Sequence, residues 1–246
     1  MRVVVVGGTW GVGLGVAQRI RAAGHEAVSA SPNNGANPLT GEGLERVLAG
    51  ASVVVDLTNN PSVEDNDVAE LVRASTDNLL RAERAAGVGH HVGWSVLGIE
   101  RSPQVPYFQA KLVQDALIKG SGIPYSFVYS TQMFEFLQSA ENTFDVGSEL
   151  RVPPIDFQPV AAQEVVGQLA ATALGEPLNG GVQIAGPERY RMDEFFREVL
   201  AGRGDPRPVV VDPNSRCYGG VTAKDALVPT DAAVLGTIRF ADWAKK

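Results

Sequence analysis

The chain has 246 residues, of which 44% are hydrophobic, and a formal net charge of −7 at pH 7. The length fits one large α/β domain or a core with a small appendage, and the acidic balance argues against nucleic acid or an anionic membrane as a partner, because neither polyanion would be attracted overall. One cysteine, Cys217, excludes an intramolecular disulfide, and the three histidines give no zinc-type spacing with it, so no metal is expected. With no charged leader or membrane-spanning apolar stretch in the sequence, a cytoplasmic location is expected.

The first twenty residues predict a strand, a glycine-rich turn and a helix. The run Val3 to Val6 is typical of a strand buried on both faces, and GGTWGVGLG then leads into VAQRI, with apolar residues at helical spacing. A backbone without side chains lets a bulky anion approach main-chain N–H groups, and the new helix directs its positive end at that anion. Close packing of the helix on the strand is the structural alternative, and no Gly-Lys-Ser or Gly-Lys-Thr makes the turn a P-loop. We therefore predict a nucleotide pyrophosphate site formed by Gly7, Gly8, Thr9, Trp10, Gly11, Val12 and Gly13.

A second strand over 25–31 ends in the polar sequence SASPNNG. In dinucleotide folds an acid just past this strand binds the free ribose 2′-hydroxyl of NAD. Ser29, Ser31, Asn33 and Asn34 stand where that acid would be, so NADP is expected, with NAD possible, and Ser31 is predicted to contact the cofactor.

A short helix over 41–50 and a buried strand over 52–57 follow, and that strand ends in DLTNNP. The carboxyl ends of parallel strands form the ligand-binding edge of open α/β sheets. Asn59 and Asn60 are therefore predicted to line the cofactor, with an ordinary turn as the alternative.

A long amphipathic helix over 67–86 and a strand over 91–97 come next. Neighbouring strand residues point to opposite faces, so His90 and His91 are expected to cap the strand start rather than share a metal ion. In the helix predicted over 106–119, Tyr107 and Lys111 lie one turn apart. A lysine ammonium beside a phenol lowers a pKa that is normally about 10, which makes Tyr107 a candidate proton donor. Ser95 either binds the same substrate oxygen or is an ordinary serine at a strand end.

A strand over 126–129 leads to STQMFEF, where Gln132, Phe134 and Phe136 either line a substrate pocket or form a core between two lobes. Helices over 160–174 and 192–202 and strands over 181–185 and 208–211 follow, and Phe240 and Trp243 are expected to form a packed terminal anchor. This alternation of strands and helices predicts a doubly wound, mostly parallel α/β Rossmann sheet. A nucleotide-binding core over 1–131 and a small, irregular part over 132–246, which completes the sheet and forms the substrate pocket, make one integrated domain.

The chain resembles the NmrA-like NAD(P)H-binding branch of the atypical short-chain dehydrogenase/reductases over nearly its whole length. The resemblance lies in GGTWGVG, WSVLG followed by YFQAK, GIPYSFVYSTQMFEF, FQPVAAQEVV and AGPE. Trp10 replaces the third glycine of the family's Gly-Gly-Thr-Gly-x-x-Gly pattern. The resemblance implies that Tyr107 donates a proton to a carbonyl oxygen as NAD(P)H delivers hydride, that Ser95 orients that oxygen, and that Lys111 holds the nicotinamide ribose and tunes Tyr107.

These observations predict an NAD(P)H-dependent oxidoreductase that reduces a small carbonyl or quinone-like substrate. A non-catalytic NAD(P)-sensing regulatory protein is one alternative, because some proteins that resemble this branch bind dinucleotide without turnover. A cofactor-independent lyase, isomerase or cyclase on the same scaffold is another, suggested by the bulky Trp10. The pattern specifies neither the substrate nor the oligomeric state.

Overall fold

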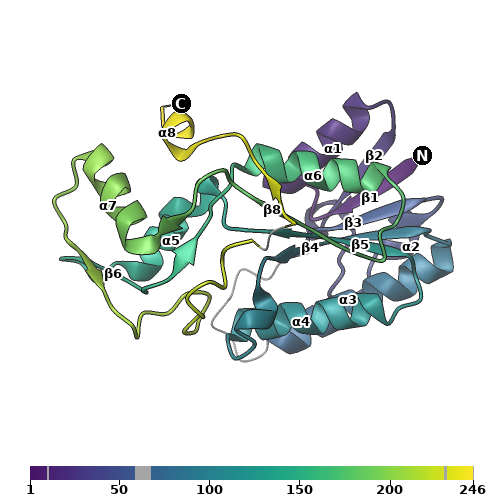
Figure 1. The fold of residues 1–246 in the computed structure, drawn as a ribbon. Helices are drawn as coiled ribbons and strands as arrows, with labels where there is room; N and C mark the ends of the chain where they lie inside the picture. Colours follow the sequence, from purple (N-terminus) through teal and green to yellow (C-terminus); the bar gives the residue numbers. More distant parts are fainter. Residues whose placement is uncertain (10, 59–67, 230–231, 246) are drawn as a thin grey trace. The chain divides into compact units, whose positions relative to one another are not determined.

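The computed structural model describes residues 1–9, 11–58, 68–229 and 232–245, and its main feature is a seven-stranded sheet in the order β11-β8-β5-β4-β3-β1-β2 (Figure 1). β1 pairs in parallel with both β2 and β3, β3 pairs in parallel with β4, and β8 with β11. This architecture confirms the predicted doubly wound α/β Rossmann fold. The strands are β1 (Arg2–Val6), β2 (Glu26–Ala30), β3 (Val53–Asp56), β4 (His90–Val96), β5 (Tyr125–Ser130), β8 (Gly180–Ala185) and β11 (Val234–Leu235).

The chain divides into two compact units, of which the first comprises residues 1–95, 110–129 and 163–182. Around the strands of this unit, α1 and α6 lie on one face of the sheet and α3 and α4 on the other (Figure 1). Because helices cover both faces, the valines of β1 and β3 are buried, which is why these strands are continuous apolar runs. The helices are α1 (Gly11–Ala22), α2 (Leu44–Leu48), α3 (Val68–Ala86), α4 (Pro106–Lys119) and α6 (Ala162–Leu174).

The second unit comprises residues 96–109, 130–162 and 183–246 and contains two further small sheets. In one, β6 (Leu150–Val152) pairs in parallel with β10 (Val209–Val211); in the other, β7 (Asp156–Phe157) pairs antiparallel with β9 (Tyr190–Arg191). Its helices include α5 (Leu137–Phe144), α7 (Met192–Arg203) and α8 (Phe240–Trp243).

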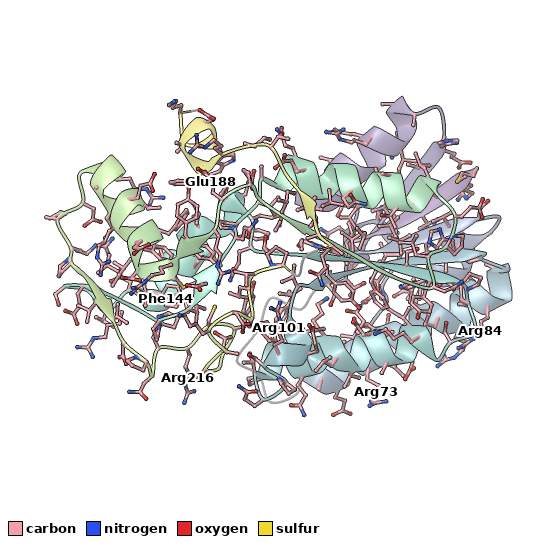
Figure 2. All side chains as sticks on the ribbon, in the orientation of Figure 1. Arg73, Arg84, Arg101, Phe144, Glu188 and Arg216 are labelled. Atoms are coloured by element: carbon pink, nitrogen blue, oxygen red, sulfur yellow. The ribbon has the colours of Figure 1, made fainter. Side chains whose placement is uncertain are left out.

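Aromatic rings fill the core of the second unit. The ring of Phe195 lies 5.0 Å from that of Phe157 and 4.7 Å from that of Phe240. Phe144, which is labelled in Figure 2, packs edge-on against Phe196. Phe240 is buried and stacks on Trp243, which confirms the predicted terminal anchor.

Arg101 ties the segment 225–228 to the rest of the second unit. Its guanidinium donates hydrogen bonds to the backbone carbonyls of Asp225, Ala226 and Val228 (Figure 2). A fixed fork of donors suits such a cluster of carbonyls, so one side chain orders a stretch that has little regular structure of its own.

Three differences from the sequence-based expectations have local causes. The helix predicted over 41–50 is only five residues long, because Gly43 and Gly50 adopt positive φ values on either side of it. The strand predicted over 208–211 does form, but it pairs with β6 instead of entering the main sheet. The short strands β6, β7, β9 and β11 and the helix α5 were not predicted.

Candidate nucleotide site and the Lys111 network

A cavity of about 490 Å³ opens in the first unit where β1, β2 and β3 end. The residues that line it come from the ends of these three strands, from the loop that follows β2, and from helices α3 and α4. None of the described lining residues is charged, and the volume lies within the range of small-molecule sites. They are Val6, Gly7, Ser31, Pro32, Asn37, Pro38, Leu39, Leu57, Thr58, Leu71, Val72, Ser75 and Gln114.

The start of α1 offers backbone donors to an anion. The N–H of Gly7 donates to the carbonyl of Ala30 (2.8 Å) and that of Gly8 to the carbonyl of Val5 (3.2 Å), so these two amides are already hydrogen-bonded within the protein. The helix begins at Gly11, which has a φ of +52° and open space where a Cβ would lie, and its first turn contains no acidic residue. The amides of the first helical turn have no partner within the helix, so Gly11 and Val12 can donate to a phosphate. Trp10 lies outside the described residues.

The loop after β2 is shaped by Asn34. Its Oδ1 accepts from the N–H of Ser31 (2.8 Å) and its Nδ2 donates to the carbonyl of Ser29 (2.7 Å). Asn34 thus holds the turn, while Ser31 itself lines the cavity. Sequence reasoning did not find the neighbouring Asn37, because nothing in the pattern indicates that the loop turns back toward the end of β1.

Thr58 provides an independent test of whether a ligand fits this cavity. Its N–H donates to Oδ1 of Asp56 (2.8 Å), but its buried hydroxyl oxygen has no hydrogen-bond partner among the described residues. A buried hydroxyl without a partner is unfavourable, so one that lines a cavity fits a polar ligand such as a ribose. The predicted contacts Asn59 and Asn60, directly after it, lie outside the described residues.

Lys111 is buried and its ammonium is held by Gln114. The Nζ atom lies 2.9 Å from Oε1 of Gln114, with longer contacts to the carbonyls of Thr58 (3.4 Å) and Trp94 (3.5 Å). The Nε2 of Gln114 in turn donates to Oδ2 of Asp56 (3.0 Å). Gln114 and Asp56 were not predicted as site residues, although both lie in the same network as Lys111.

Ser95 lies near the end of β4 and is buried beside the acidic residue of α4. Burial raises the pKa of that acid, Asp115, and the hydrogen bond from Tyr129 and the charges of Lys119 and Lys111 partly oppose the shift. The Tyr129 hydroxyl donates to Oδ2 of Asp115 at 2.7 Å. The first unit therefore places Ser95 and Lys111 next to two consecutive polar residues of one helix.

Tyr107 belongs to the second unit, at the start of α4. It is buried, and its ring stacks almost parallel on that of Tyr218, with centroids 5.4 Å apart and planes 9° apart. Tyr218 has a φ of +57° in a two-residue turn closed by hydrogen bonds between the backbones of Cys217 and Gly220. Such a conformation is uncommon for a bulky residue, so the turn is held by its surroundings.

The three predicted substrate residues lie in the segment after β5. Nε2 of Gln132 lies 3.8 Å from the sulfur of Cys217, in the turn that carries Tyr218. Phe134 is buried, with its ring 5.5 Å from the rings of Phe240 and Trp243, and Phe136 is 43% exposed. Substrate contact by these residues stays a prediction.

The two adjacent histidines contact different elements, as expected for opposite faces of a strand. Nε2 of His90 lies 2.8 Å from Oγ of Ser126, and Nδ1 of His91 lies 2.9 Å from Oε1 of Glu83. Burial disfavours charge on His91, but the Glu83 carboxylate outweighs it and raises the pKa of His91. Within the described ranges, no cluster of three or more His, Cys, Asp or Glu residues could hold a metal ion, and no helix is long and apolar enough to cross a membrane.

The sequence matches no protein-family model, and no curated protein matches it. Solved structures do match. A dTDP-glucose 4,6-dehydratase from Streptomyces venezuelae with NAD bound is 16% identical, with a TM-score of 0.73 over 98% of this chain and 94% of that one. A short-chain dehydrogenase/reductase superfamily protein from Agrobacterium tumefaciens with bound NAD is 16% identical, with a TM-score of 0.68 over 92% and 89% of the two chains.

A triphenylmethane reductase from Citrobacter complexed with NADP(H) is 19% identical, with a TM-score of 0.62 over 87% of this chain and 80% of that one. At such identities the likeness concerns architecture and not activity. The comparisons show that the chain has a Rossmann-type α/β fold shared with NAD(P)-binding enzymes.

Proposed function

We propose that the chain is an NAD(P)H-dependent oxidoreductase that reduces a small carbonyl or quinone-like substrate. The observation that carries the proposal is the uncharged cavity of about 490 Å³ where β1, β2 and β3 end, next to the glycine turn. Ligands of open α/β sheets bind at this edge. The three structural relatives were crystallised with NAD or NADP(H), which supports a nicotinamide dinucleotide as the cofactor.

The residues of the first unit fit such a cofactor. The amides of Gly11 and Val12 at the start of α1 would bind its pyrophosphate, and the cavity would take its adenosine half, with Ser31 and Thr58 as hydroxyl partners. We favour NADP over NAD because none of the described residues that line the cavity near Ser31 is an acid, and a carboxylate there would repel a 2′-phosphate.

The catalytic part of the proposal is carried by residue type and spacing. When bound, the reduced cofactor supplies a hydride to the substrate's carbonyl carbon. Tyr107 then donates its phenolic proton to the carbonyl oxygen, which Ser95 orients by a hydrogen bond. Lys111, one turn after Tyr107 in α4, holds the nicotinamide ribose.

Titration of the purified protein with NADPH and NADH, followed by nicotinamide fluorescence, tests the cofactor. We expect micromolar binding with a preference for NADPH, and oxidation of NADPH by at least one member of a carbonyl and quinone panel. Tyr107→Phe should lower turnover by about 10²- to 10⁴-fold, the usual contribution of a general acid, without weakening NADPH binding. Tyr125→Phe, on β5, is the matched control.

Two results would refute the oxidoreductase. Failure of both nucleotides to bind would exclude a dinucleotide enzyme and favour the cofactor-independent alternative. Tight NADPH binding without oxidation by any member of the panel would identify a sensor instead.

A further inference from the structure

We propose that Gln114, which lines the nucleotide cavity and is held by Asp56, is a positioning residue that orients the ammonium of Lys111. This inference rests on the proposed function, because it gives Lys111 a role toward a bound dinucleotide. It concerns only the first unit, where all three residues lie.

The carboxylate of Asp56 determines which way the Gln114 amide is oriented. Asp56 is the last residue of β3 and is almost completely buried; its Oδ1 accepts from the N–H of Thr58 and its Oδ2 from Nε2 of Gln114. An ionised carboxylate only accepts hydrogen bonds, so it must face the NH₂ end of the amide. The carbonyl oxygen of Gln114 is thereby turned toward Lys111, and it accepts from Nζ at 2.9 Å.

The hydrogen bond from Lys111 to Gln114 is shorter than the contacts of Lys111 with two backbone carbonyls. The carbonyls of Thr58 and Trp94 lie 3.4 and 3.5 Å from Nζ, at the limit of a hydrogen bond. A buried ammonium needs such partners, because burying an unpaired charge is costly. Gln114 therefore determines where the nitrogen of Lys111 lies.

A neutral amide suits this position better than a carboxylate. A direct Lys–Asp pair would satisfy the ammonium so strongly that a ribose hydroxyl would compete poorly for it. Gln114 engages one of the three N–H donors and keeps the negative charge of Asp56 one side chain away. Because Gln114 also lines the cavity, the bridge joins the nucleotide pocket to Lys111.

Two substitutions together test this hydrogen-bond pattern. Gln114→Glu places two carboxylates against each other, so we expect NADPH affinity and kcat/KM to fall by about 10- to 100-fold, the scale of a lost hydrogen bond to a charged group. Adding Asp56→Asn restores a donor opposite an acceptor at both ends of the side chain of residue 114 and should recover part of the loss. The rest should remain, because the introduced carboxylate still pairs directly with Lys111. Gln114→Leu should behave like Gln114→Glu but gain nothing from Asp56→Asn.

Coupling to Lys111 separates positioning from a general structural effect. In a Lys111→Ala background, Gln114→Leu should cause no further loss of NADPH affinity. Gln109→Leu, at an exposed position of the same helix, is the matched control and should change nothing in either background.

A second readout does not need the cofactor. We expect acetic anhydride to acetylate Lys111 at least several-fold faster in Gln114→Leu than in Gln109→Leu, as followed by peptide mass spectrometry, because the amine loses its short hydrogen bond. An unchanged acetylation rate, or equal losses with and without Lys111, would overturn the bridge. A wild-type protein that binds no NADPH would overturn the proposed function instead, and the acetylation rates would still decide whether Gln114 holds Lys111.

Discussion

Gly13 and Gly15 lie two residues apart in α1, and a methyl group added at each would meet very different neighbours. At Gly13 a Cβ would overlap the carbonyl oxygen of Gly7 and lie 2.7 Å from the Cα of Gly8, and both are backbone atoms of the turn. At Gly15 it would lie 3.1 Å from Cγ2 of Val166, a side-chain atom of α6. We therefore expect Gly13→Ala to push α1 away from the turn and Gly15→Ala to be tolerated.

The two variants form a matched pair because alanine improves helix propensity in both, by up to about 1 kcal/mol each. Because both variants gain this helix propensity, the difference between their free energies of unfolding reports the cost of packing the new methyl group. Overpacking against a rigid site costs about 1–3 kcal/mol, whereas a side chain that shifts by a few tenths of an ångström costs little. Gly13→Ala should therefore be less stable than Gly15→Ala by roughly 1–3 kcal/mol.

Urea unfolding followed by far-UV circular dichroism measures this difference in the free energy of unfolding. NADPH titration of the same two variants shows whether the displaced turn also affects the proposed pyrophosphate site, in which case only Gly13→Ala binds more weakly. Equal stabilities would show that the turn can move away at little cost. The close approach of helix and turn would then not be the reason for a glycine at position 13.

Two further predictions concern buried titratable groups. Burial, aided by the charge of His91, lowers the pKa of His90 from 6.5 to about 4. Between these pH values His90 is protonated in the unfolded chain but not in the folded protein. The free energy of unfolding should therefore fall as the pH drops through this window, by up to about 3 kcal/mol. Denaturation of His90→Gln should show a shallower fall, and an identical pH profile would contradict the assignment. Burial also raises the pKa of the Cys217 thiol to about 12. Because the thiolate is the reactive form, Ellman's reagent at pH 8 should label Cys217 only after unfolding in urea; rapid labelling of the native protein would mean that the turn 217–220 opens.

The elements that the sequence predicts well are those whose pattern is complete within one stretch of chain. β1 and β3 are apolar runs buried on both faces, and α4 begins at Pro106 and ends at Lys119, as its sequence indicates. β7 and β9 are only two residues long, and Asp156 pairs with Arg191 far along the chain. A two-residue strand carries no periodicity, so only the tertiary pairing defines it.

The same distinction applies to the candidate site: residues with a local sequence signal were predicted, and residues defined only by tertiary contacts were not. Gly7 and Ser31 stand at strand ends where the fold class alone places ligand contacts, and Lys111 follows from its spacing to Tyr107. The bridge from Asp56 to Gln114 joins residues 58 positions apart, which no local pattern specifies. Two signals were nevertheless present. An acid that ends a buried strand needs a partner, and Gln114 lies three residues after Lys111, on the same face of α4. A buried acid at a strand end and an amide next to a proposed catalytic lysine therefore predict each other, because the amide donates the hydrogen bond that the buried carboxylate needs.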